Sequence, residues 1–294
     1  MTPVAELERD YEYVQGADPL TVAQNGRVGV GDPHVHFTGD VIGTPKSKLL
    51  AAQSLDIVAV ADHDRLSGPT IERKRDNLEL SLEIISASEI TADSLGSDRG
   101  QHSGKHLLVY RLKKLIPCKT TSGRLISPQD LIKAAHDQGA VVAVAHPELG
   151  GFSYIADEIR EMAGWDEPPD LIEVFNGGAR NVDRSRLGRV LREHVSGLEK
   201  RIPASGSNTQ ARTIFEEVKD KLFPLGGSDA HNARNVRDVV TGFDPEMDFF
   251  AAIRAGRSFV MRRKKPNRHT ISNIVVGTIK GRQLEKSRLL GLAV

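Results

Sequence analysis

Histidine and carboxylate residues recur along the chain in short polar motifs that adjoin apolar runs. The motifs are Gly-Asp-Pro-His-Val-His (31–36), Ala-Asp-His-Asp (61–64), Ser-Glu (88–89), His106, Ala-His-Pro (145–147), Glu-Val-Phe-Asn (173–176) and Gly-Ser-Asp-Ala-His (227–231). His34 and His36 are two positions apart, so on an extended strand both imidazoles face the same way and can ligate one cation. Asp229 and His231 have the same spacing. The motifs therefore indicate a metal centre.

Imidazole and carboxylate ligands suit divalent ions that activate water. Two cations about 3.5–4 Å apart can hold the oxygens of a phosphoryl group, and a bound cation can lower the pKa of water to about 7, giving hydroxide at neutral pH. Cys118 is the only cysteine, which excludes an internal disulfide, a cysteine-based zinc knuckle and an iron–sulfur site. A single histidine at a strand end usually only makes a hydrogen bond there. Because histidines or carboxylates recur at every strand, a metal-binding cluster is the better explanation. We therefore expect a metal-dependent hydrolase.

Apolar β-branched runs alternate with helix-like stretches, which predicts an α/β fold on a largely parallel sheet. The predicted strands are 27–31, 56–61, 83–88, 105–111, 140–145, 170–175 and 223–227. The predicted helices include 45–54, 71–82, 127–138, 183–199 and 245–255, and the predicted loops include 95–104 and 205–213. Seven strands suit one barrel better than two domains. We place each motif at or near the C-terminal end of its strand, the edge where ligands gather in α/β barrels.

The composition is that of an ordinary globular protein, with 294 residues, 39% apolar content and a net charge of +1. No apolar run approaches the roughly 18 residues of a membrane span, and the acidic N-terminus lacks the plan of a secretory signal. These features predict a soluble, cytoplasmic protein without membrane contact. We expect an N-terminal extension (1–27), a hydrolase barrel (28–261) and a basic C-terminal segment (262–294) packed on the same domain. The five cations within Arg262–Arg268 suit a solvated charge run or a contact with nucleic acid.

The ordered motifs Gly-Asp-Pro-His-Val-His, Ala-Asp-His-Asp, Ser-Glu-Ile-Thr, Ala-His-Pro and Gly-Ser-Asp-Ala-His resemble those of the polymerase-and-histidinol-phosphatase (PHP) superfamily. The resemblance extends from Val28 to His231 and more weakly to Met261. It implies a distorted seven-stranded (β/α)7 barrel, similar to a TIM barrel. It also implies a site for two or three divalent ions (Mn²⁺, Fe²⁺ or Zn²⁺) and phosphoesterase activity, which is hydrolysis of phosphoric esters.

Carried over residue by residue, the resemblance implies up to three metal positions. The first position would be held by His34, His36, Glu89 and Asp229. Glu89 would bridge to a second position, held with it by His106 and His146. The third would take His63, His231 and the carboxylate of Asp40, which follows His36 by four positions where the family pattern has five. We prefer His106 to the nearby His102 because an apolar strand follows it. His63 and His231 are also the candidates for giving a proton to the leaving group.

A phosphate substrate also needs donors outside the metals. Lys105, Arg180 and Arg212 stand in or beside the loops of the same edge, although each alone is better explained as a solvated surface charge. The Asn176-Gly177-Gly178 turn offers backbone N–H groups, and a tight turn without a ligand explains it equally well. We expect the substrate to be a small nucleotide-like or sugar-phosphate mono- or diester. Histidinol phosphate is not favoured, because Phe37–Gly43 adds no histidine.

Three other functions fit the same residues. A hydrolase of a non-phosphate ester or amide would use the same activated water. A nuclease or proofreading module would bind nucleic acid through the basic segment. A non-catalytic metal-binding protein would have the same metal ligands but no hydrolytic activity. The leaving group, the physiological metal and the oligomeric state are not determined by the sequence.

Overall fold

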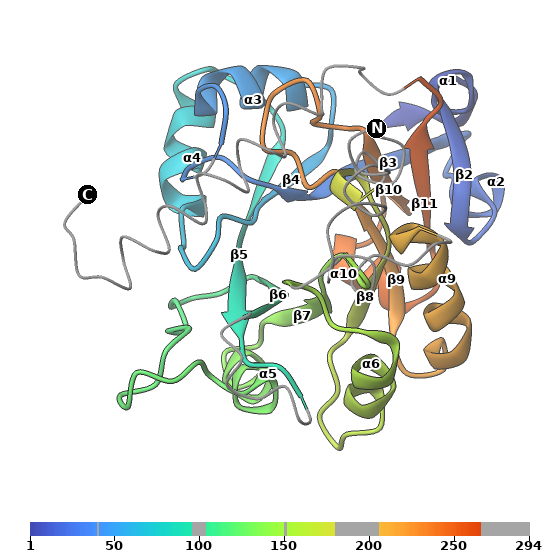
Figure 1. Ribbon diagram of the computed structural model, residues 1–294. Coiled ribbons are helices and arrows are strands. Elements are labelled where there is room, and N and C mark those ends of the chain that lie inside the picture. Colours follow the sequence, from blue (N-terminus) through green and yellow to red (C-terminus); the bar gives the residue numbers. More distant parts are fainter. Residues whose placement is uncertain (40, 96–103, 150–151, 180–205, 266–294) are drawn as a thin grey trace, which may run out of the picture.

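The computed structural model of the chain describes residues 1–39, 41–95, 104–149, 152–179 and 206–265 (Figure 1). Its strands are β1 (Thr2–Pro3), β2 (Tyr11–Gly16), β3 (Arg27–Val35), β4 (Ile57–Val60), β5 (Glu83–Ala92), β6 (Lys105–Tyr110), β7 (Val141–Val144), β8 (Leu171–Asn176), β9 (Phe223–Gly227), β10 (Val239–Phe243) and β11 (Ser258–Arg263). Its helices are α1 (Val4–Asp10), α2 (Pro19–Val22), α3 (Pro45–Ala52), α4 (Gly68–Asp76), α5 (Pro128–His136), α6 (Ala156–Ala163), α9 (Ser207–Val218) and α10 (Phe249–Arg254).

All of these strands belong to one sheet in a mixed α/β fold. The order is β2-β11-β10-β3-β4-β5-β6-β7-β8-β9, and β1 pairs with β3. The seven strands predicted from the sequence correspond to β3 through β9, so the sequence located this part of the sheet. The total of seven is wrong, because the sheet has 11 strands within the described residues alone. The four additional strands come from the N-terminal region and from the chain after β9, and they extend the sheet beyond β3.

The strand directions also differ from the predicted, largely parallel sheet. The pairs β3–β4, β4–β5, β7–β8 and β8–β9 are parallel, but β6 is antiparallel to both β5 and β7. The pairs β3–β10, β10–β11 and β2–β11 are antiparallel as well. Because β6 runs in reverse, its first residues lie beside the end of β5, with His106 opposite Thr91. His106 thus reaches the same edge as the other motifs from the start of its strand, not from its end as predicted.

The sheet curls into a nearly closed barrel. Where β3 ends, Val35 forms a parallel bridge with Ala230, which follows β9 in the chain. Further along the seam between β9 and β10, no ladder joins the strands, and the Thr241 hydroxyl takes its place. This hydroxyl donates to the carbonyl of Gly226 (2.9 Å) and accepts from its N–H (3.1 Å). The barrel is therefore closed partly by backbone and partly by one buried side chain.

Alternation along the strands divides the side chains between an inner and an outer face. Leu108 and Tyr110 of β6 belong to an inner apolar cluster, together with Phe249 and Phe250 of α10, which fill the interior. Leu107 and Val109 of β6 face outward. His106 has the parity of Leu108, and Glu89 has that of the buried Ala87 on β5. The pattern of the strands therefore points these two polar side chains into the barrel.

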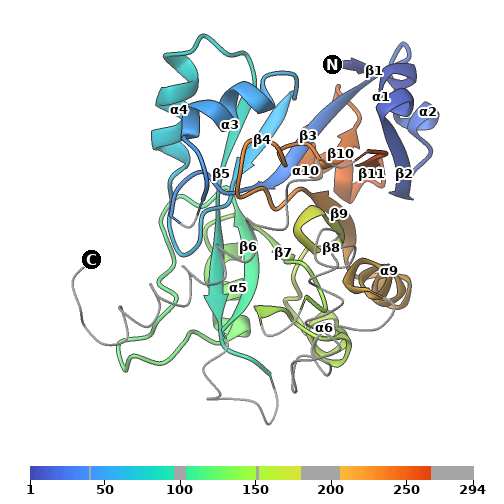
Figure 2. The same cartoon turned by 45° about the horizontal axis from the view of Figure 1, so that its top comes forward.

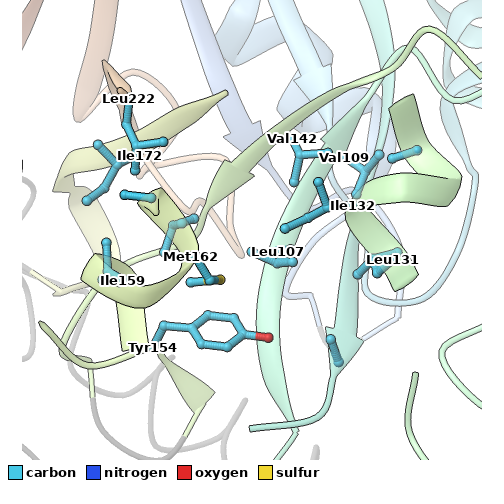
Figure 3. Packing of buried hydrophobic residues seen from close by; sticks show 14 of the residues in the cluster. Leu107, Val109, Leu131, Ile132, Val142, Tyr154, Ile159, Met162, Ile172 and Leu222 are labelled. Carbon is cyan, nitrogen blue, oxygen red and sulfur yellow. The ribbon is translucent and has the colours of Figure 1, made fainter. Parts of the chain in front are cut away.

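Several helices cover the outer face of the curved sheet, whereas α10 packs against the interior. α5, α6 and α9 pack on β6 to β8, where Leu107 and Val109 meet Leu131 and Ile132 of α5, and the cluster continues to Met162 of α6 (Figure 3). Figure 2 shows α3 and α4 together beside β4, while β1, α1, β2 and α2 lie around β11. Within the described residues, no helix has the length and apolar character needed to cross a membrane.

One predicted loop is wrong, and two other predicted segments lie wholly or mostly outside the described residues. The predicted loop 205–213 is wrong from Ser207 onward, because α9 begins there, directly after Gly206 with φ +84°. Buried Ala211, Ile214 and Phe215 give this helix an apolar face, but the sequence of its first turn is polar and therefore resembles a loop. The predicted helix 183–199 lies outside the described residues, as does most of the predicted loop 95–104.

Candidate metal centre

A register shift in β3 turns His34 and His36 toward the barrel interior. The pairing of β3 with β4 is interrupted between Asp32 and Val35, around Pro33. Such bulges commonly re-aim side chains beside functional sites. The buried carboxylate of Asp32 fixes the irregular backbone by accepting hydrogen bonds from the N–H groups of Ser228 (2.9 Å) and Arg237 (2.9 Å). Both histidine side chains are fully buried as a result.

Glu89 lies at the centre of the cluster, and histidines surround both of its carboxylate oxygens. Imidazole nitrogens approach these oxygens to between 2.7 and 3.5 Å, from His34, His36, His63, His106 and His146. Oε1 faces His106 Nδ1 (2.8 Å) and His146 Nε2 (2.7 Å), whereas Oε2 faces the other three residues. Oε2 is buried and accepts no hydrogen bond from any described residue. A cation would satisfy an oxygen in this situation.

Four ligand atoms form a cage of the size that a divalent metal requires. Nε2 of His34 and Nε2 of His36 are 3.1 Å apart, and their distances to Glu89 Oε2 and Asp229 Oδ1 range from 3.2 to 3.6 Å. A tetrahedral metal bonded at about 2.0–2.1 Å holds its ligand atoms about 3.3–3.4 Å apart. These residues are the set predicted for the first position. His34, His36 and Glu89 have ligand atoms within 4.8 Å of one another, and Asp229 lies close to both imidazoles.

The remaining histidines offer further positions around the same carboxylate. His63, Glu89 and His106 have ligand atoms within 4.8 Å of one another, and so do His36, His63 and His231. His146 Nε2 contacts Glu89 Oε1, as expected for a second position bridged by this carboxylate. His63 thus has neighbours at both the second and the third expected positions. Asp40, the remaining expected ligand, lies outside the described residues.

The electrostatics of the cluster favour bound positive charge. Burial lowers the pKa of His36, but its contacts with Asp229 and Glu89 outweigh burial and raise this pKa to about 9. Burial likewise opposes protonation of His34, yet nearby carboxylates hold its pKa well above the usual value. Burial would raise the pKa of Glu89, but the surrounding imidazoles, His63 foremost, hold it well below the usual value. The buried carboxylates therefore remain ionised, and protons or metal ions must balance them.

Two of the expected ligands have an unusual backbone conformation. The φ angles of His146 and Asp229 are +29° and +50°, in the left-handed region that non-glycine residues rarely adopt. Backbone strain of this kind is concentrated at functional sites. Close packing also limits the space around these ligands. A Cβ atom on Gly227 would lie 2.6 Å from the Cβ of His34, so β9 can approach His34 closely only because this position is glycine.

The predicted substrate contacts lie in varied environments. Lys105 forms a buried ion pair with Glu158 of α6. The side-chain amide of Asn176 is also buried and bonds to Glu173 and to the N–H of Ala179. Arg212 is half-buried on α9, and its Nε has no hydrogen-bond partner within the described part of the chain. Arg180 and His102 lie outside that part, and so do residues 266–294 of the basic segment.

Sequence reasoning assigned no role to several residues that touch the cluster. The Ser153 hydroxyl is 2.8 Å from His146 Nδ1, and the ring of Phe152 stacks on His106 with centroids 5.6 Å apart. The ammonium group of Lys48, fully buried on α3, donates to the backbone carbonyl of His36. Glu173 contacts His34 Nδ1 at 3.0 Å. Its signal was visible in the sequence as a single acid on the inner face of the apolar strand Leu-Ile-Glu-Val-Phe.

Comparison with solved structures finds several distant likenesses. A Bifidobacterium adolescentis protein suggested to be a metal-dependent phosphoesterase has 17% identity and a TM-score of 0.44, over 68% of this chain and 87% of that one. The lesion-specific endonuclease PfuEndoQ from Pyrococcus furiosus has 17% identity and a TM-score of 0.43, over 78% and 55%. An amidohydrolase from Chromobacterium violaceum, with bound sulfate and no metal, has 14% identity and a TM-score of 0.49, over 81% and 98%. No curated protein matches the chain.

One segment of the chain, which includes the motif at 227–231, also matches a known family model. Residues 206–258 match the family model PHP_C, described as PHP-associated. This segment contains α9, β9 and the motif with Asp229 and His231. The match confirms, over this segment, the resemblance to the PHP superfamily that the ordered motifs predict.

Proposed function

We propose that this protein is a metal-dependent hydrolase that cleaves a phosphate mono- or diester of a small nucleotide-like or sugar-phosphate substrate. The observation that carries the proposal is the environment of Glu89, each of whose two oxygens faces its own set of imidazoles. A bridging carboxylate between two imidazole-rich positions is a ligand arrangement suited to a pair of divalent ions.

The residues around Glu89 fit such ions by number, type and spacing. His34, His36, Glu89 and Asp229 would hold one ion, and Glu89 with His106 and His146 would hold a second, while a third would take His63 and His231. We propose Mn²⁺, Fe²⁺ or Zn²⁺, because these ions accept imidazole and carboxylate together. When bound, the ions would lower the pKa of a water and offset negative charge on phosphoryl oxygens.

His63 and His231 are the members of the cluster that substrate can reach most easily. Their side chains are 31% and 28% exposed, whereas those of His34 and His36 are fully buried. His231 Nδ1 lies 3.1 Å from the backbone carbonyl of Asp229, which orients the ring and leaves Nε2 on the opposite side. We propose that whichever of these two histidines is not bound to a metal ion gives a proton to the leaving oxygen.

Phe152 supports a nucleotide-like substrate over a sugar phosphate. Its ring is 38% exposed and stacks on His106 with an interplanar angle of 24°, so an apolar aromatic surface stands beside the second metal position. Stacking of a base on an aromatic side chain contributes about 1–3 kcal/mol. Half-buried Arg212 remains a proposed phosphate contact, because its Nε has no hydrogen-bond partner among the described residues.

The test is a substrate panel on the metal-loaded protein and on chelator-treated protein. The panel contains nucleoside monophosphates, nucleoside bisphosphates, sugar phosphates, bis-p-nitrophenyl phosphate and a carboxylic ester. We expect phosphate release that depends on Mn²⁺ and falls at least 100-fold in His231→Gln. The matched control is His136→Gln, which removes a histidine of α5 that bonds to Asp170, and it should retain full activity.

Two results would contradict the proposal. Metal-loaded protein that cleaves the carboxylic ester but no phosphate would assign the site to carbonyl chemistry. Two bound ions without turnover of any member of the panel would assign the chain to metal binding alone. Equal turnover of nucleotides and sugar phosphates, unchanged in Phe152→Leu, would remove the preference for a nucleotide.

A further inference from the structure

The buried carboxylate of Glu173 touches residues of both principal metal positions. Glu173 lies on β8, is fully buried, and contacts neither Glu89 nor Asp229 in any hydrogen bond or ion pair of the described residues. Its Oε1 is 3.0 Å from Nδ1 of His34, an expected ligand of the first position. Its Oε2 accepts from the backbone N–H of His146, an expected ligand of the second, at 2.8 Å.

Neighbouring groups fix which way each hydrogen bond of Glu173 runs. The backbone N–H of His146 can only donate, so Oε2 must accept. The amide oxygen of Asn176 accepts from the N–H of Ala179 (2.9 Å), which turns its NH₂ group toward Oε2 at 3.0 Å. Oε2 therefore receives two donors that cannot reverse. Oε1 is left to face His34, and a carboxylate oxygen is an acceptor only.

This arrangement sets the tautomer of His34 in the metal-bound state. Because Glu173 Oε1 accepts, the proton of the neutral ring lies on Nδ1 and the lone pair lies on Nε2. That nitrogen is the atom in the four-atom cage, 3.5 Å from Glu89 Oε2 and 3.6 Å from Asp229 Oδ1. A histidine that ligates a metal commonly donates its other N–H to a carboxylate, which orients the ring and strengthens the ligand.

The second oxygen of Glu173 acts on the backbone of His146. With φ at +29°, this residue has a left-handed conformation that costs about 1–3 kcal/mol and must be held by its surroundings. The hydrogen bond from its N–H to Glu173 holds the residue from one side. On the other side Ser153 Oγ is 2.8 Å from Nδ1, so Nε2 points at Glu89 Oε1.

We propose that Glu173 is a positioning residue that couples the two metal positions, one oxygen orienting His34 and the other anchoring His146. The inference rests on the metal-dependent site proposed above, but it concerns metal affinity and is independent of the substrate. A glutamine has the same shape but cannot accept hydrogen bonds on both sides. Its NH₂ group must face either His34 Nδ1 or the two fixed donors at Oε2. In the first case the proton of His34 moves to the ligating nitrogen.

The experiment measures Mn²⁺ binding to the metal-free protein by calorimetry and by competition with a chelating dye, at one fixed pH. In Glu173→Gln we expect the affinity of both positions to fall about 10–100-fold. The matched control is Ser153→Ala, which removes the hydroxyl beside His146 Nδ1 and should weaken the second position alone. A second control, Glu158→Gln, changes a buried glutamate that pairs with Lys105 and should leave both affinities unchanged.

A spectroscopic readout separates positioning from general loss of structure. With diamagnetic Zn²⁺ bound, ¹⁵N spectra of the wild-type protein should show the Nδ1 of His34 protonated and its Nε2 bound, and Glu173→Gln should lose this pattern. Far-UV circular dichroism and the Tm of the metal-free variant should stay near wild type. If Glu173→Gln does not fold, Glu173→Asp is the alternative. It keeps the negative charge on a side chain that is one methylene shorter, and the Mn²⁺ affinity of both positions should again fall.

The possible results decide the inference clearly. Wild-type affinity at both positions in Glu173→Gln and Glu173→Asp overturns it. A fall at the second position only, equal to that of Ser153→Ala, overturns the coupling through His34. If both affinities fall while the wild-type protein cleaves no phosphate ester, the inference stands and the proposed function fails.

Discussion

Binding of metal should release protons, and the size of the effect follows from the buried histidines. Carboxylates raise the pKa of His36 to about 9 and hold that of His34 well above its usual value, so at neutral pH this pair of rings holds at least one proton that an incoming metal ion must displace. An imidazole must lose this proton before it can ligate. Each displaced proton makes the apparent association constant rise tenfold per pH unit below the pKa of the ring.

The expected magnitude is about 100-fold for one proton between pH 6 and pH 8, equal to about 2.7 kcal/mol. If His34 and His36 are both deprotonated by the same ion, the rise approaches about 10⁴-fold over this range. Mn²⁺ affinity would be measured by dye competition at each pH. Calorimetry in buffers with different enthalpies of ionisation would count the protons released.

The control for this experiment is a histidine with a raised pKa outside the centre. The hydrogen bond that His136 on α5 donates to the Asp170 carboxylate raises the pKa of this histidine, so His136→Gln should give the wild-type slope and proton count. An association constant that changes less than threefold from pH 6 to pH 8, with no proton release, would show that His34 and His36 do not bind the ion.

Three further predictions concern the architecture around the centre. Gly227→Ala should lower Mn²⁺ stoichiometry, measured by elemental analysis, because the new Cβ would lie 2.6 Å from that of His34; unchanged metal content would contradict this. Leu107→Ala should reduce the free energy of unfolding in urea by about 2–5 kcal/mol, since its side chain is fully buried in the outer cluster. His136→Gln should destabilise the protein by up to about 1 kcal/mol at pH 6 and by less at pH 9. The sign follows because Asp170 raises the pKa of His136 in the folded protein. The stabilisation is therefore complete below the unfolded-state pKa and is lost as pH rises through the folded-state pKa. Equal shifts of the urea midpoint at both pH values would refute this prediction.

The strands of the barrel were predictable because each carries a continuous buried run. Ile57–Val60 and Val141–Val144 have only β-branched or small apolar residues, and both were located. The direction of β6 was not predictable, because Lys105–Tyr110 reads the same in either orientation. Antiparallel pairing depends on contacts with β5 and β7, and a single strand does not encode them.

The candidate site was predicted in its ligands but not in its supports. The histidines of the motifs and Glu89 are recognised by residue type and spacing, and the structure brings them together around one carboxylate. Glu173 and Ser153 act through three-dimensional contacts with His34 and His146 that no spacing reveals. The helix α9 was missed because its first turn is polar and follows Gly206, while its apolar face appears only beyond Ala211.

The wall of the barrel depends at one point on the hydroxyl of Thr241, which substitutes for a run of backbone pairs between β9 and β10. A joint made by one side chain can part without melting either strand, because each strand keeps its ladder on the other side. Asp229 stands just beyond this joint on the β9 side. Next to it, Ala230 keeps backbone hydrogen bonds to His34 and His36, so opening of the Thr241 joint alone would loosen the wall while this ligand stays anchored to the end of β3.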